Sequence, residues 1–249
     1  MGDLYNDIYF GDINQRYEEL ADISKEEWSM PGKNDKSILK NYLKYTYKKL
    51  EEESKVINTD SYGIFNTGLF TEYYEPIFAY SEVNKAGGNQ KYYLKGFMTP
   101  YDLGEKGIDN LPERANYFEY PELLVFDAKC LINVQYKHIL SDEENLKRMP
   151  ANIKSFKNLQ HILCGAIEAM KKKVSANYKI AVPQYFNGKI QLLLPLCLVD
   201  PDVPDLALVV TKNQAGNYYQ GHTCLTLEMA YNNARLIAKP DSNWLQLKG

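Results

Sequence analysis

The dipeptide Asn187-Gly188 is the strongest local fold signal in the chain. Both central residues of a type I′ turn have positive φ, a conformation that asparagine and glycine tolerate better than most residues. Strand-like runs flank the dipeptide, and two more follow it after short polar breaks. These runs are Tyr178 to Phe186, Lys189 to Leu198, Leu206 to Lys212 and Tyr218 to Cys224. They predict an antiparallel meander in the second half of the chain.

A second group of strand-like runs lies in the first half of the chain, separated by turn signals such as Gly87-Gly88. These runs are Tyr62 to Asn66, Pro76 to Val83 and Tyr92 to Met98, and we predict another antiparallel meander from them. After an irregular stretch rich in Gly and Pro, a short buried strand is also predicted at Leu123 to Asp127.

Three segments have the apolar spacing of amphipathic helices. The first begins at about residue 37 and has the apolar residues Leu39, Leu43, Tyr47 and Leu50. The second covers residues 153–176 and has the apolar residues Phe156, Leu159, Leu163, Ile167, Met170 and Val174. The third covers residues 225–237, with Thr226 as a candidate N-cap.

Together these elements predict an α+β fold. We expect mostly antiparallel sheet(s) built from two meanders, with helices packed on one face. Residues 1–34 are predicted to form an N-terminal arm and residues 35–249 a single α+β domain. No internal repeat is visible in the sequence.

The composition limits the cellular locations and the kinds of partner that we expect for this chain. No apolar run reaches the length of about 18 residues that a membrane-spanning helix needs, so no membrane is expected. Four widely spaced cysteines suit reduced thiols, and residues 1–16 lack the pattern of a secretory signal, so we expect a cytoplasmic protein. The net charge of −3 confines any nucleic-acid contact to a local patch. The 21 tyrosines also leave room for a protein partner, and the oligomeric state stays open.

Metal and thiol chemistry have little support in the sequence. The close pairs His161/Cys164 and His222/Cys224 do not complete the four-ligand sets of structural zinc. We therefore expect no metal and no cofactor. Cys224 shares a predicted strand face with His222, as a nucleophile would, but a cysteine in a meander strand is more often part of the core.

Acid–base catalysis needs fewer residues than a metal site does. His138 and His222 are the candidate general acid and general base for phosphodiester cleavage, with an arginine to hold the phosphate charge. Each histidine also lies beside apolar residues, as packed and hydrogen-bonded core histidines do.

Two segments could hold a phosphate or a base without catalysis. Asn66, Thr67 and Gly68 stand at a predicted strand end, where a glycine permits close backbone approach, although a tight turn explains them equally well. Glu228, Asn232 and Arg235 share one helix face, which fits either a ligand site or an intrahelical ion pair. The lysines between Lys171 and Lys179 suit either single-stranded nucleic acid or a solvated helix end.

Several segments, in the same order, resemble a bacterial family known as domain-of-unknown-function family 3825. The resemblance runs from about Ser37 to Trp244. It rests on Phe65 to Leu69, Leu111 to Ala115, Leu124 to Asp127, His138 to Leu140 and Ala181 to Tyr185, and is closest through Gly188 to Leu198 and Gly221 to Trp244. The resemblance implies an association with RNA-related modules and no assigned catalytic residues.

The leading functional hypothesis is an RNA- or nucleotide-binding domain. Arg114 and Arg235 would hold phosphate, Asn66 and Asn232 would hydrogen-bond base or ribose, and His138 and His222 would carry a proton. One alternative is a metal-independent phosphodiesterase or ribonuclease that uses the two histidines, and another is a non-catalytic protein-interaction scaffold. Whether the chain is an enzyme stays open.

Overall fold

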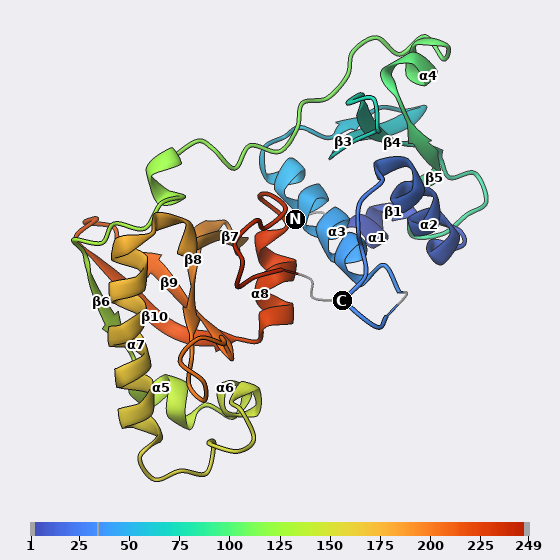
Figure 1. The fold of residues 1–249 in the computed structure, drawn as a ribbon. Helices are drawn as coiled ribbons and strands as arrows, with labels where there is room; N and C mark the ends of the chain where they lie inside the picture. Colours follow the sequence, from blue (N-terminus) through green and yellow to red (C-terminus); the bar gives the residue numbers. More distant parts are fainter. Residues whose placement is uncertain (1–2, 34, 247–249) are drawn as a thin grey trace. The chain divides into compact units, whose positions relative to one another are not determined.

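The computed structural model describes residues 3–33 and 35–246. Its contacts divide the chain into two compact units, one ending at Asn116 and the other beginning at Tyr117 (Figure 1). Residues 4–24, predicted as part of an arm, contribute two helices and a strand to the first unit. The single domain predicted from residue 35 onward stays a prediction.

The first unit is built on a five-stranded sheet of order β1-β5-β4-β3-β2. All neighbouring strands are antiparallel except β1 and β5, which are parallel. The three predicted strands are present as β3, β4 and β5. The elements are α1 (Leu4–Asp7), β1 (Ile8–Tyr9), α2 (Ile13–Ser24), α3 (Ser37–Glu52), β2 (Ile57–Asn58), β3 (Tyr62–Phe70), β4 (Pro76–Val83), β5 (Tyr92–Met98) and α4 (Pro100–Gly104).

Both faces of this sheet carry helices. The predicted apolar stripe of α3 is buried, and Tyr47 from it contacts Phe65 of β3 with ring centroids 5.1 Å apart. Because side chains alternate along a strand, the neighbouring Ile64 points to the other face, where it packs with Leu103 of α4 and with Ile108. The α4 segment thus covers the part of that face around Ile64 and Tyr80, and Tyr62 packs against the edge of this cluster.

The second unit is built on a five-stranded sheet of order β6-β10-β9-β8-β7, in which β6 and β10 are parallel. At the predicted turn between β7 and β8, Asn187 and Gly188 have φ angles of 47° and 76°, as a type I′ hairpin requires. The elements are η1 (Pro121–Leu123), β6 (Leu131–Val134), α5 (Tyr136–Ser141), α6 (Glu143–Arg148), α7 (Leu159–Ala176), η2 (Tyr178–Ile180), β7 (Val182–Phe186), β8 (Lys189–Leu196), β9 (Leu206–Lys212), β10 (Tyr218–Leu225) and α8 (Leu227–Ala234).

The core of the second unit lies between α7 and one face of the sheet (Figure 1). Leu163 and Ile167 of α7 pack with Leu192, Leu194 and Leu208 there. Helix α8 packs on the opposite face near β7, where Asn233 donates a hydrogen bond to Gln184 at 3.1 Å. The predicted N-cap is confirmed, since Thr226 accepts from the backbone N–H of Met229.

The two units share one topology. Each has a first strand, then helices, then a four-stranded meander whose last strand pairs in parallel with the first, and then a helix on the opposite face. The α+β prediction with two meanders is confirmed, but helices pack on both faces of each sheet rather than on one face as predicted. The repeated strand order was not visible in the sequence, because strand order depends on pairing between distant segments rather than on local residue pattern.

One predicted strand is absent and several predicted boundaries are wrong; for example, β3 continues to Phe70 rather than ending at Asn66, and α8 ends at Ala234 rather than at residue 237. Leu123 to Asp127 is not a strand: residues 121–123 form a 3₁₀ turn after Pro121, and Phe126 stacks on Tyr219 with ring centroids 4.7 Å apart. Helix α7 begins at Leu159, not at residue 153, and Phe156, which is 48% exposed, is not part of its buried stripe. Residues 178–180 form a 3₁₀ turn, so β7 begins only at Val182.

Candidate functional site

The predicted binding residues of the first unit form a self-satisfied bulge in β3. The pairing of β3 with β4 shifts between Asn66 and Phe70. Asn66 accepts from the Gly68 N–H at 2.9 Å and donates to the carbonyl of Pro112 at 3.3 Å. Thr67 donates to the carbonyl of Ile77 at 2.7 Å. Both side chains are buried, so they hold the bulge rather than face a ligand.

Arg114 joins these residues from the segment after α4. Its guanidinium donates to the carbonyl of Gly68 at 2.9 Å and lies 4.8 Å from the ring centroid of Phe70. The structure therefore brings Asn66, Gly68 and Arg114 together. Their contacts attach the segment at 112–114 to the sheet.

The two candidate catalytic histidines lie on different elements. His138 is exposed on α5 and His222 is half-buried on β10. His222 stands in a bulge, because the pairing of β10 with β9 shifts between Gly221 and Thr223. Across the residues that the structure describes, no hydrogen bond or ion pair links the histidines to each other.

Helix α6 fixes the strand just after this bulge. Asn145 accepts from the Thr223 hydroxyl at 2.6 Å and from the Cys224 N–H at 3.2 Å. Arg148 donates to the Cys224 carbonyl at 2.8 Å. The Cys224 thiol itself lies in the core, and burial raises its pKa to about 12. It stays protonated at neutral pH, which excludes it as a nucleophile.

The predicted ligand face of α8 is divided between solvent and interior. Glu228 is exposed and Asn232 is half-buried, but Arg235 is only 7% exposed. The three side chains therefore do not present one surface to a ligand. Within residues 3–33 and 35–246, no group of three or more His, Cys, Asp or Glu side chains is arranged to hold a metal ion.

A row of tyrosines crosses the first sheet on the face that also carries α4. Tyr9 of β1 is the register partner of Tyr93 of β5, Tyr93 is the partner of Glu82 of β4, and Glu82 is the partner of Tyr62 of β3. The rings of Tyr9 and Tyr93 are 5.8 Å apart, and Tyr9 is 48% exposed. We call this surface, formed by Tyr9, Tyr62, Tyr93 and Glu82, the tyrosine face.

Two lysines border the tyrosine face. The Lys95 ammonium lies 5.8 Å from the ring centroid of Tyr93 and 3.7 Å from the Glu82 carboxylate. The Lys106 ammonium lies 5.3 Å from the ring centroid of Tyr80, which in turn neighbours Tyr62. Burial, and then the Glu82 charge, raise the pKa of Tyr80, so its hydroxyl stays neutral.

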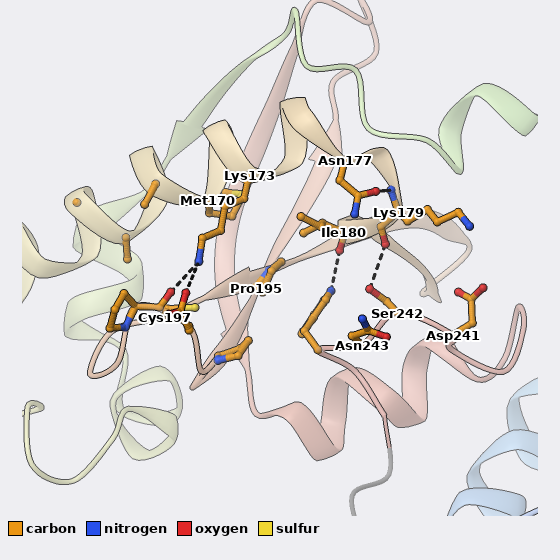
Figure 2. A pocket seen from close by; sticks show the side chains of 17 residues that line it. Met170, Lys173, Asn177, Lys179, Ile180, Pro195, Cys197, Asp241, Ser242 and Asn243 are labelled. Atoms are coloured by element: carbon orange, nitrogen blue, oxygen red, sulfur yellow. Dashed lines mark hydrogen bonds and ion pairs between the residues drawn. The ribbon is translucent and has the colours of Figure 1, made fainter.

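The second unit contains a cavity of about 760 Å³ (Figure 2). Its walls are one side of α7, the end of β8 with the loop that follows, and residues 241–244. Two hydrogen bonds hold that last segment in place: the Trp244 indole donates to the Ile180 carbonyl at 2.7 Å, and the Ser242 hydroxyl donates to the Lys179 carbonyl at 3.1 Å.

The lysines near this cavity differ in their pairing. Lys173 donates to the Pro201 carbonyl at 2.7 Å and lies 3.6 Å from Asp202. Lys171 pairs with Glu168 at 2.6 Å. The predicted basic patch is therefore partly neutralised by its neighbours.

The model of a family described as a domain of unknown function (DUF3825) matches residues 20–244. The chain belongs to this family. The DUF3825 match runs through both units, so both sheets lie in the matched region. Comparison with curated proteins and with solved structures gave no match. None of the helices in the described part of this DUF3825 chain is long and apolar enough to cross a membrane.

Sequence reasoning missed the tyrosine face and the cavity of this DUF3825 chain. The tyrosines were counted, but their alignment depends on the parallel pairing of β1 with β5. The cavity depends on residues 241–244 returning to η2. In the sequence, the tyrosine face was signalled only by the excess of tyrosine, and the cavity only by the polar segment after Pro240.

Proposed function

We propose that the chain binds single-stranded RNA on the tyrosine face of the first sheet. The observation that carries this proposal is the pairing of Tyr9 of β1 with Tyr93 of β5 on neighbouring strands, with Tyr62 of β3 in the same row beyond Glu82 of β4. Strands lie about 4.8 Å apart, so a row of rings gives successive bases a series of stacking positions. Sheets with exposed aromatic rings bind single-stranded RNA in this way in other folds.

The charges of the face fit the backbone of such a ligand. Lys95 and Lys106 hold two ammonium groups at the border of the rings, within reach of phosphates. Glu82 is the one carboxylate in the row, and Lys95 lies beside it. The binding charge is thus local, which agrees with a net charge of −3 for the whole chain.

Fluorescence anisotropy with a labelled oligouridine of about ten nucleotides tests the proposal on the full chain. Tyr9→Ala removes a stacking ring and should weaken binding by about tenfold. Tyr73→Ala is the matched control, because Tyr73 is an exposed tyrosine in the β3–β4 turn and is not part of the row. Its affinity should equal that of the unsubstituted chain.

Lys95→Gln should weaken binding and reduce the slope of log K against log salt concentration by about one. Equal losses from Tyr9→Ala and Tyr73→Ala, or no saturable binding at all, would contradict the proposal and favour the protein-interaction scaffold.

The alternative of metal-independent phosphodiester cleavage is examined in the same samples. The labelled RNA is incubated with the protein in EDTA and its length is read on a gel. Cleavage that His222→Ala abolishes would make the chain an enzyme. We place the proposed RNA binding in the cytoplasm, which the free cysteines favour.

A further inference from the structure

We infer that the cavity of the second unit binds the guanine ring of a nucleoside or nucleotide. This site is separate from the tyrosine face, and its occupancy does not depend on RNA binding there. The cavity of about 760 Å³ falls within the size range of small-molecule sites.

Most of the cavity wall is apolar. The α7 side contributes Ala166, Ala169 and Met170, and Trp244 also lines the cavity. The Trp244 indole N–H is already bonded to the Ile180 carbonyl, so this side chain offers a ligand only its carbon surface. Such a wall favours a flat, apolar ring.

Two charged side chains remain for the ligand. Lys173 is held by Pro201 and Asp202, whereas Lys179 and Asp241 are exposed and form no ion pair within the described residues. The bond between Ser242 and the Lys179 carbonyl brings their two segments together, and Figure 2 shows both side chains at the same end of the cavity. Both also line a second cavity of about 300 Å³, so open space borders them on two sides.

This pair selects among flat rings by its hydrogen bonds. A carboxylate only accepts hydrogen bonds, and an ammonium group only donates them. Guanine has N–H donors on its Watson–Crick edge for Asp241, and O6 and N7 acceptors for Lys179. Guanine places its N1–H and N2–H donors side by side, so one carboxylate can accept from both, whereas adenine offers a carboxylate only its N6 amino group and uracil only its N3–H. The ring of guanine can meanwhile lie against the apolar wall.

Tryptophan fluorescence gives a direct readout on the full chain. Trp28 is 1% exposed in the core of the first unit, and Trp244 lines the cavity. Guanosine should change the Trp244 emission of a Trp28→Phe variant in a saturable way, and uridine should not. Calorimetric titration of the unsubstituted chain with guanosine repeats the measurement without relying on that variant.

Two substitutions test the assigned contacts. Asp241→Asn and Lys179→Met should each weaken guanosine binding by about tenfold. Glu143→Gln and Lys157→Met are matched controls, since both residues are exposed in the second unit and outside the cavity lining. The inference is overturned if guanosine does not bind, if uridine binds equally well, or if the controls lose as much affinity as the two test variants. Failure of oligouridine to bind the tyrosine face would leave these results unaffected.

Discussion

At Gly68 a single residue holds two parts of the first unit together. Its φ of 79° is strained for any residue with a side chain, and its carbonyl accepts the hydrogen bond of Arg114. A Cβ atom at this position would lie 2.5 Å from the Tyr42 hydroxyl oxygen, and the next nearest atom, Tyr42 Cζ, would be at 3.8 Å. The sequence indicated a glycine that permits close backbone approach. The partner in that approach is a helix, not a phosphate.

Gly68→Ala should lower the free energy of unfolding by about 2 kcal/mol, because backbone strain adds to the clash with Tyr42. Urea denaturation of the full chain measures this loss. In the double variant Gly68→Ala/Tyr42→Phe the clash is absent, so its loss should be smaller than the sum of the two single losses. Strict additivity would show that Tyr42 does not oppose the new methyl group.

At the scale of elements, short side-chain networks attach the irregular segments to the sheets. Glu53, at the end of α3, accepts from Lys49 at 2.8 Å and from the backbone N–H of Asn116 at 3.1 Å. Lys55 lies 3.1 Å from Glu53 and donates to the Arg114 carbonyl at 3.0 Å. The segment at 112–116 is thus fixed by α3 and by the bulge of β3.

Burial alone would raise the pKa of Glu53, but hydrogen bonds from Lys49, Asn116 and Lys55 outweigh burial, and the pKa lies below its ordinary value. A depressed pKa in the folded state adds stability that is present above the unfolded pKa and is lost as the pH falls through the folded pKa. Glu53→Gln should therefore cost about 1–2 kcal/mol at pH 7.

The difference between Glu53→Gln and the unsubstituted chain should be constant at neutral pH and should shrink below about pH 4.5. Urea denaturation at several pH values follows it. Glu72→Gln, at an exposed position in the β3–β4 turn, is the control and should show no such change. A difference that stays the same in acid would contradict the assignment of the network to the ionised carboxylate.

At the scale of the whole molecule, the repeated topology is the main finding. Both sheets have a parallel edge pair and a three-hairpin meander. The side chains on the two sheets differ. The first sheet has the tyrosine row, and the second has amides, with Gln184 donating to Gln191 at 2.8 Å and Gln191 donating to Thr211 at 2.9 Å. One topology therefore carries different side chains in its two copies, and Gln184 of the second sheet is buried beneath Asn233 of α8.

The two tryptophans report on the two units separately, with Trp28 in the first and Trp244 in the second. If each unit unfolds on its own, Gly68→Ala should shift the urea transition seen by Trp28 and leave the transition seen by Trp244 unchanged. Single-tryptophan variants, Trp244→Phe and Trp28→Phe, give the two readings. Equal shifts of both transitions would instead support the single domain that the sequence predicts.

The elements that sequence reasoning located correctly depend on residues close together in the chain. Asn187-Gly188 forms a hairpin because both residues accept positive φ, and α3 buries the stripe that its spacing predicts. Leu123 to Asp127 was misassigned because a short apolar run does not distinguish a strand from a turn whose side chains reach a core.

The sequence alone determined the meanders, the long helices, the Thr226 cap and the membership of a family. Only the tertiary structure decided which side chains meet. Tyr9 lies beside Tyr93, and the segment of Asp241 lies beside that of Lys179, through contacts across long stretches of chain. Local residue patterns set backbone conformation over a few residues, whereas parallel pairing and chain return depend on the packing of the whole unit, which no local pattern encodes.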